Sequence, residues 1–194
     1  MRNTIILILV SMLLALGTAQ AWTKEFKQPR TNQLDLGLEL DFALPVPQSK
    51  ALQDYLGLAP GQTFTLDQVQ TDILIIEIFS MYCPICQREA SNVNKLFQMI
   101  QATESYRKSI RLLGIGAGNS AYEVDFFKEN YNIEFPLFSD GKFLIHKKIG
   151  EKGTPFFIGL RPGSPKGSRV FFTHSGEIKD LDDFLNQLIK TSHE

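Results

Sequence analysis

The segment from residue 73 to residue 100 constrains the fold more than any other part of this sequence. Ile73 to Phe79 is a nearly continuous β-branched and apolar run, broken only by Glu77, which is typical of a central strand covered on both faces. Further along, apolar residues recur at helical spacing, namely Ala90, Val93, Leu96, Phe97 and Ile100. The sequence therefore predicts a buried strand that leads directly into a helix.

The two cysteines of the chain, Cys83 and Cys86, fall at this predicted junction. A structural disulfide stabilises mainly by restricting the unfolded chain, and a loop this short restricts little. The pair is therefore better suited to a reversible redox couple, and a Cys83–Cys86 disulfide is the only redox group that we expect. Pro84 would be the first helical residue, a position that proline favours.

Position predicts different roles for the two thiols. The free amides and dipole at the start of the helix favour a thiolate at Cys83, which is the predicted nucleophile. Cys86 lies one turn further in, where it would resolve a mixed disulfide formed on Cys83. Burial would raise the pKa of Glu77 and allow it to exchange a proton with Cys86; the alternative is a solvated position at an edge.

A lone Cys-x-x-Cys pair is also half of a zinc site, but zinc generally needs four ligands and no second cysteine pair exists. The histidines are scattered singly at positions 146, 174 and 193, so we expect no bound metal. Two other uses of the pair stay open. One is a carrier that holds a soft metal such as Cu(I) between the thiolates, and the other is a thiol peroxidase, with Ser80 three residues before Cys83.

The first residues predict export. A charge at Arg2, an apolar run from Ile5 to Leu16 and the small-residue pattern Ala19-Gln20-Ala21 are typical of a secretory signal peptide over residues 1–21. An uncleaved anchor is the alternative and the one route by which we expect membrane contact. We therefore predict a periplasmic or otherwise exported protein that is a monomer.

The rest of the chain is divided into an arm at 22–58 and one domain at 59–194. The formal net charge of −1 comes with no basic stripe, so we expect no nucleic-acid partner. Ser120 and Glu123 form a capping box for a helix. The further predicted elements are strands at 62–66 (as the start of a hairpin), 110–115, 135–138, 156–160 and 170–173, a turn at 139–141, a loose connection at 161–169, and helices at 144–149 and 181–189.

Two separated motifs resemble those of a known family. The run ILIIEIFSMYCPIC, from Ile73 to Cys86, resembles the strand and active-site turn of the thioredoxin superfamily, and GTPFFI, from Gly153 to Ile158, resembles its cis-proline strand. The resemblance covers about residues 60 to 190 and is nearest to the exported TlpA-like thiol-disulfide oxidoreductases.

This resemblance implies a thioredoxin-like α/β fold: a central mixed sheet flanked by helices, with an N-terminal extension and a central strand-helix insert supplied by residues 120–138. It implies that Glu77 is the buried acid and that a substrate segment contacts five residues, Tyr82, Pro84, Ile85, Thr154 and Pro155. It also implies exchange with protein thiols or disulfides and with a membrane redox partner. A reductant is favoured, although Pro84-Ile85 does not decide the direction, and Tyr82 replaces the usual tryptophan, which leaves partner choice open.

Overall fold

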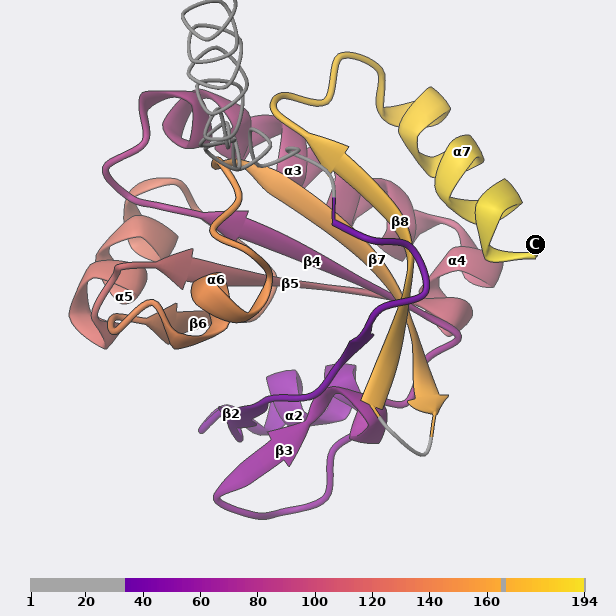
Figure 1. Ribbon diagram of the computed structural model, residues 1–194, viewed down its shortest axis with the longest axis horizontal. Coiled ribbons are helices and arrows are strands. Elements are labelled where there is room, and N and C mark those ends of the chain that lie inside the picture. Colours follow the sequence, from indigo (N-terminus) through magenta and orange to yellow (C-terminus); the bar gives the residue numbers. More distant parts are fainter. Residues whose placement is uncertain (1–33, 165–166, 194) are drawn as a thin grey trace, which may run out of the picture. The chain divides into compact units, whose positions relative to one another are not determined.

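The computed structural model describes residues 34–164 and 167–193 (Figure 1). The predicted signal peptide and the first part of the arm, residues 1–33, lie outside the described residues. Within the described ranges, no helix combines the length and apolarity that a membrane crossing requires.

A six-stranded mixed sheet forms the centre of the fold. Its strands lie in the order β1 (Glu39–Leu40), β8 (Gly167–Ser175), β7 (Phe156–Ser164), β4 (Ile73–Phe79), β5 (Ile110–Ala117) and β6 (Leu137–Asp140). The central strand β4 runs parallel to β5 and antiparallel to β7. This arrangement confirms the predicted mixed sheet.

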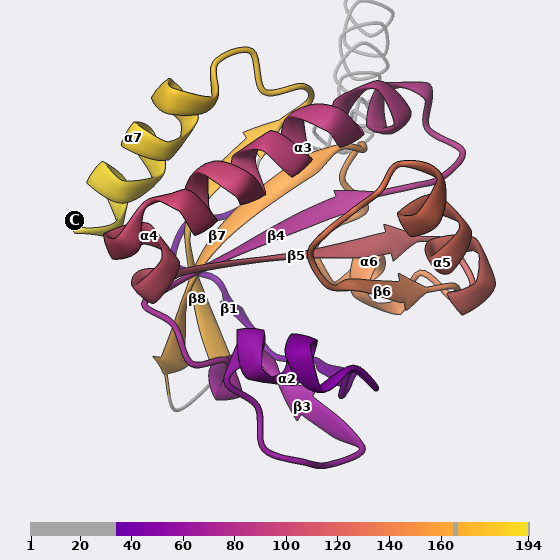
Figure 2. The same cartoon turned by 180° about the vertical axis from the view of Figure 1, so that it is seen from behind.

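Helices cover both faces of the sheet, and Figure 2 shows α3 and α7 lying across one of them. That face packs against α3 (Pro84–Ala102), α5 (Ala121–Asn130) and α7 (Leu181–Ser192). The opposite face packs against α2 (Lys50–Leu56), the two-stranded sheet of β2 (Ala43–Pro45) and β3 (Thr63–Thr65), the 3-10 turn η1 (Leu66–Gln68) and α6 (Leu144–Lys148). A further short helix, α4 (Glu104–Ser109), connects α3 to β5.

The central strand β4 contributes to both cores, because successive side chains of a strand point to opposite faces. Ile75 and Phe79 pack in the core under α3, whereas Ile76 and Ile78 pack in the core of the other face. Glu77 shares the parity of Ile75 and Phe79 and is only 3% exposed. A carboxyl group is therefore buried under α3, as the continuous apolar run predicted.

The predicted insert is present as α5 and β6. Ser120 caps α5 and Glu123 completes the capping box, with the Ser120 backbone N–H donating to Glu123 Oε2 at 2.6 Å. Strand β6 then extends the sheet by pairing parallel to β5. Figures 1 and 2 both show α5 and β6 at the side of the sheet on which α3 begins.

Three predicted elements were wrong in detail. The strand at 62–66 does not begin a hairpin: Thr63–Thr65 pairs with the earlier strand β2, because the chain turns at once into η1, which Thr65 and Gln68 cap. The turn predicted at 139–141 begins too early. Ser139 and Asp140 belong to β6, and the Asp140 carboxylate accepts from the first amides of α6.

The third correction concerns the connection predicted at 161–169. Most of it is strand, because Arg161 pairs with Arg169 and Ser164 with Gly167 across the β7–β8 hairpin. Irregularities in the register accommodate Pro162 and Gly163, which break a regular ladder. Proline and glycine therefore mark bulges here and not a loop.

The described part of the arm, residues 34–58, packs against the sheet. Strand β1 pairs antiparallel with β8 at one sheet edge. Leu34, Leu40, Leu44 and Leu56 are all buried in the second core. These residues therefore share a hydrophobic core with the sheet.

Candidate active site

Cys83 is the N-cap of α3 and Pro84 is its first residue, as the sequence predicts. The Cys83 sulfur accepts the Cys86 backbone N–H at 3.3 Å, which satisfies one of the amides that a helix start leaves without a partner. Both cysteines are free thiols; Cys83 is half-buried and Cys86 is fully buried. One sulfur is therefore accessible and the other lies behind it.

The segment that leads into β7 lies beside this turn because β7 is the antiparallel neighbour of β4. The Thr154–Pro155 peptide bond is cis. The Cys83 thiol donates to the Thr154 carbonyl at 3.2 Å, while the Pro155 carbonyl accepts from the Gly176 backbone N–H at 2.9 Å. Of these two carbonyls, that of Thr154 is the one in contact with Cys83.

The surroundings separate the acidities of the two thiols. Partial burial alone would raise the pKa of Cys83. Hydrogen bonds with the Thr154 and Cys86 side chains and with the Cys86 and Ile85 backbone outweigh burial and lower this pKa. Burial, followed by the hydrogen bond with Cys83, raises the pKa of the Cys86 thiol well above its ordinary value. Cys83 is therefore the thiol that ionises first, and Cys86 needs a base before it can react.

Glu77 is the residue that the sequence analysis proposes as that base. Burial raises its pKa to about 8, and the charges of Glu89 and Cys83 act in the same direction. Because the Cys83 charge acts on Glu77, the carboxyl group belongs to the same electrostatic unit as the dithiol. At neutral pH the group is mostly protonated, so its titration lies in the range in which a proton can be exchanged.

Glu89 is a second buried acid, which the sequence analysis missed. It lies on α3 three residues after Cys86 and is 1% exposed. Burial raises its pKa, although the Ile178 backbone N–H, which it accepts at 2.8 Å, and Asn92 act in the opposite direction. Its position three residues after Cys86 and four before Val93 was the available signal, because this spacing puts it on the inward face of α3.

The other predicted site residues form the exposed rim of the dithiol. Pro84 and Ile85 are exposed on the first turn of α3, and the Tyr82 side chain is 65% exposed. The Tyr82 hydroxyl donates to Glu123 of α5, so the insert reaches the residue before the nucleophile. The structure thus places Cys83, Thr154 and Pro155 together, Cys86 and Glu77 beneath them, and Tyr82, Pro84 and Ile85 around them.

Within residues 34–164 and 167–193, the structure contains no group of three or more His, Cys, Asp or Glu side chains arranged to hold a metal ion. His146 bonds to the Lys152 carbonyl, and His174 packs against Phe157 and Phe184. These two half-buried histidines therefore have partners within the fold.

A reduced dithiol at the start of a helix, beside a cis-proline on the antiparallel neighbour of the central strand, defines a dithiol protein of the thioredoxin-like fold. The chain belongs to the AhpC/TSA family, whose model matches residues 41–180. The resemblance to the thioredoxin superfamily is thereby confirmed.

Known proteins similar to this chain are remote in sequence. The thiol-disulfide oxidoreductase ResA of Halalkalibacterium halodurans is 20% identical over 132 residues, which cover 67% of this chain and 69% of ResA. StoA of Bacillus subtilis has a similar fold with a TM-score of 0.54 at 15% identity, covering 79% of this chain and 98% of StoA. A secreted Mycobacterium tuberculosis disulfide oxidoreductase homologous to Escherichia coli DsbE matches with a TM-score of 0.53 at 15% identity, over 77% and 95% of the two chains.

Proposed function

We propose that this protein is a thiol-disulfide oxidoreductase that exchanges disulfides with protein partners outside the cytoplasm. The observation that carries the proposal is the unequal dithiol: an accessible Cys83 with a lowered pKa in front of a fully buried Cys86 with a raised one. The names of ResA and of the secreted oxidoreductase support the same chemistry.

The exchange runs in two balanced steps. The Cys83 thiolate attacks one sulfur of a partner disulfide, forming an intermolecular S–S bond and releasing the other partner sulfur as a thiolate. Cys86 then loses its proton and attacks the Cys83 sulfur, forming the Cys83–Cys86 disulfide and releasing the second partner thiolate. Two electrons pass from this protein to the partner, whose disulfide becomes a dithiol.

Glu77 is the base that we assign to the second step. It is buried on the face of β4 that α3 covers, and the Cys83 charge acts on it. In its ionised form it would take the proton from Cys86 in this direction and return it in the reverse direction. The negative charge of Glu89 also raises the pKa of Glu77, so it helps Glu77 to keep the proton that it has taken.

The partner segment would lie across the exposed rim. The half-buried Thr154 and the exposed side chains of Tyr82, Pro84 and Ile85 surround the Cys83 sulfur, so any disulfide that reaches the sulfur covers them. Backbone pairing beside Thr154 would resemble the addition of a strand. The partner thiols or disulfides of this proposal are therefore carried by extended protein segments.

The signal-like pattern at residues 1–21 supports export, and a reductant outside the cytoplasm needs a donor that restores its dithiol. We assign this role to a membrane redox partner. The direction is tested by equilibrating the mature protein with glutathione buffers and counting free thiols by mass. A potential near or below about −250 mV supports a reductant, whereas one above about −200 mV assigns an oxidant or isomerase.

Replacing the second cysteine tests the exchange itself. Cys86→Ala cannot release the partner, so a mixed disulfide on Cys83 should accumulate with a peptide or protein disulfide and be visible on a non-reducing gel. The matched control, Cys83→Ala, should trap nothing because Cys86 is buried. If the first variant also traps nothing, the proposed function fails.

A further inference from the structure

Asn119 lies outside the dithiol motif but touches the turn that carries it. It follows β5, immediately before the cap of α5, and its side chain is fully buried. Its Oδ1 accepts the Met81 backbone N–H at 2.9 Å, across 38 positions of sequence. Met81 stands two residues before Cys83, so the β5–α5 connection holds the chain just ahead of the nucleophile.

The Asn119 oxygen is itself held in place by the sheet. The Asn119 backbone N–H donates to the Gly116 carbonyl at 3.1 Å, and its carbonyl accepts the Ser139 hydroxyl at 2.5 Å. A Cβ at Gly116 would lie 3.1 Å from Oδ1, so the side chain packs tightly against β5. Two strands of the sheet therefore fix the acceptor that Met81 uses.

The amide nitrogen of the Asn119 side chain, unlike its oxygen, has no hydrogen-bond partner among the described residues. This nitrogen, Nδ2, is buried. A buried donor without a partner costs stability, and turning the amide over would place a donor against the Met81 donor. An apolar side chain would remove this cost but would leave the Met81 N–H without its acceptor. The contribution that distinguishes asparagine here is therefore the oxygen that it offers to Met81.

The chain around Met81 is tied on its other side as well. The Met81 carbonyl accepts from Gln87 Nε2 at 2.7 Å, and the Cys83 N–H donates to the Ser80 carbonyl at 3.0 Å. Gln87 is exposed on α3, whereas Asn119 is buried in the β5–α5 connection. Asn119 is thus the buried tie between the active-site turn and the sheet.

We propose that Asn119 is a positioning residue, whose side-chain oxygen holds the Met81–Cys83 turn so that the Cys83 sulfur meets the Cys86 N–H. This inference rests on the proposed function and adds to it a residue from outside the dithiol motif. Asn119 would act only through Met81, because its side chain is buried and cannot contact a substrate protein. Without the oxygen the turn relaxes, the 3.3 Å contact between Cys83 and Cys86 N–H weakens, and less Cys83 is ionised at neutral pH.

The test compares four full-length proteins: the wild type, Asn119→Ala, Asn119→Leu and Asn119→Asp. Alanine and leucine remove the acceptor with and without a loss of volume, and aspartate restores an oxygen acceptor. The readouts are the pH profile of Cys83 alkylation by iodoacetamide and the rate of reaction with a peptide disulfide. We expect the alanine and leucine variants to react about three- to tenfold more slowly at pH 7, the range that loss of one hydrogen bond predicts. Their profiles should shift to higher pH. Because the charge of aspartate would itself raise the Cys83 pKa, that variant is compared by hydrogen exchange of the Met81 amide, whose protection it should restore.

Asn94→Ala is the matched control. Asn94 also ties a helix to the insert, because its Nδ2 donates to the Tyr131 and Asn132 carbonyls, both at 3.0 Å. Its loss should lower stability while leaving the Cys83 pH profile unchanged. An equal shift in the control would show that general loosening of the insert, and not the Asn119 oxygen, controls the nucleophile.

Three results separate this inference from the proposed function. A Cys86→Ala variant that traps no mixed disulfide on Cys83 defeats the proposed function. A reactive wild type with an unchanged profile in folded Asn119→Ala and Asn119→Leu defeats only the positioning role. If both variants unfold, hydrogen exchange of the wild-type Met81 amide decides: protection supports the role, and exchange at the rate of a free amide overturns it.

Discussion

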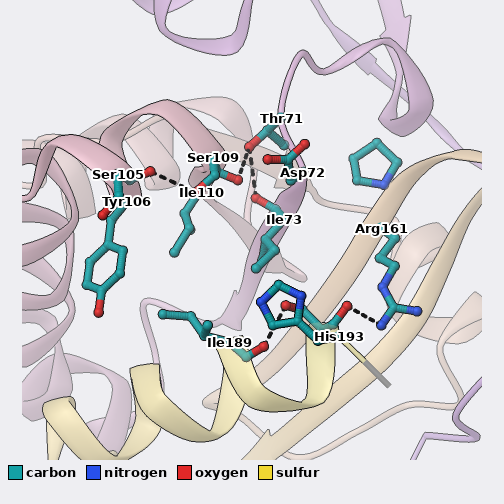
Figure 3. Close-up of a pocket in the computed structure, with 12 residues that line it drawn as sticks. Thr71, Asp72, Ile73, Ser105, Tyr106, Ser109, Ile110, Arg161, Ile189 and His193 are labelled. Atoms are coloured by element: carbon teal, nitrogen blue, oxygen red, sulfur yellow. Dashed lines mark hydrogen bonds between the residues drawn. The ribbon is translucent and has the colours of Figure 1, made fainter.

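The two ends of β4 differ: one adjoins a cavity, and the other carries the dithiol and the buried acids. At its amino end, a cavity of about 620 Å³ opens between the chain entering β4, the α4–β5 junction, β7 and the end of α7 (Figure 3). At its carboxyl end, the dithiol turn offers an exposed rim over buried acids. This cavity therefore lies at the end of β4 opposite to the one at which titratable groups are buried together.

The polar groups around the cavity are bound by the fold itself. Thr71 Oγ1 donates to the Ser109 carbonyl at 2.7 Å (Figure 3). Arg161 donates to the Thr191 carbonyl at 3.1 Å and lies over the Phe171 ring. The dithiol end instead buries Glu77 and Glu89, whose pKa values are both raised. The contrast teaches that the reactive end of this protein is marked by perturbed groups and not by volume.

The largest expected difference between the two ends comes from the nucleophile. Cys83→Ser should reduce disulfide exchange to the rate without protein, because a serine hydroxyl is not ionised near neutral pH. Turnover of a peptide disulfide measures this. Residual turnover above background would mean that Cys86 reacts without Cys83, and would contradict the assignment of Cys83 as the nucleophile.

A smaller kinetic effect is expected beneath the dithiol. Glu77→Gln should slow release from the mixed disulfide by about 100-fold at pH 7, because glutamine cannot accept the Cys86 proton. Rapid-quench measurement of the mixed-disulfide lifetime gives this rate. Glu129→Gln, at an exposed position of α5, is the control and should leave the lifetime unchanged.

Glu77 should also affect how the free energy of unfolding depends on pH. The pKa of Glu77 is raised from 4.5 to about 8, so between these values the folded protein binds more protons than the unfolded chain. Stability contributed by this group therefore falls as pH rises, with a limiting slope of about 1.4 kcal/mol per pH unit. Urea unfolding between pH 5 and pH 9 should show that the stability of Glu77→Gln relative to the wild type increases as pH rises. Parallel curves would place Glu77 in contact with solvent.

The smallest effect is expected at the cavity. Arg161→Met should lower the free energy of unfolding by about 1 kcal/mol, through loss of the bond to the α7 carbonyls and of the contact with Phe171. Urea unfolding measures this loss, and disulfide exchange should be unaffected. A matching fall in exchange rate would join the two ends of β4 into one functional unit.

Elements with a strong local pattern were predictable. The apolar run of β4, the helical spacing after Cys86 and the Ser120–Glu123 capping box all produced the expected structure. The hairpin assigned to residues 62–66 failed for a physical reason: the residues form a strand, but no local signal showed that the partner strand lies some 20 residues earlier. Proline and glycine at 162–163 misled for the opposite reason, since cross-strand pairing outweighed a local signal for a loop.

The sequence by itself determined the strand, the dithiol at the helix start, the cap and the resemblance of residues 153–158 to a cis-proline strand, because each of these depends on neighbours along the chain. Only the tertiary structure decided that Glu89 accepts from Ile178 and lies close enough to act on Glu77, and that Asn119 holds Met81. These contacts join positions 89 and 38 residues apart. Which distant residue a side chain contacts depends on how strands and helices pack, and periodicity along the chain does not predict this packing.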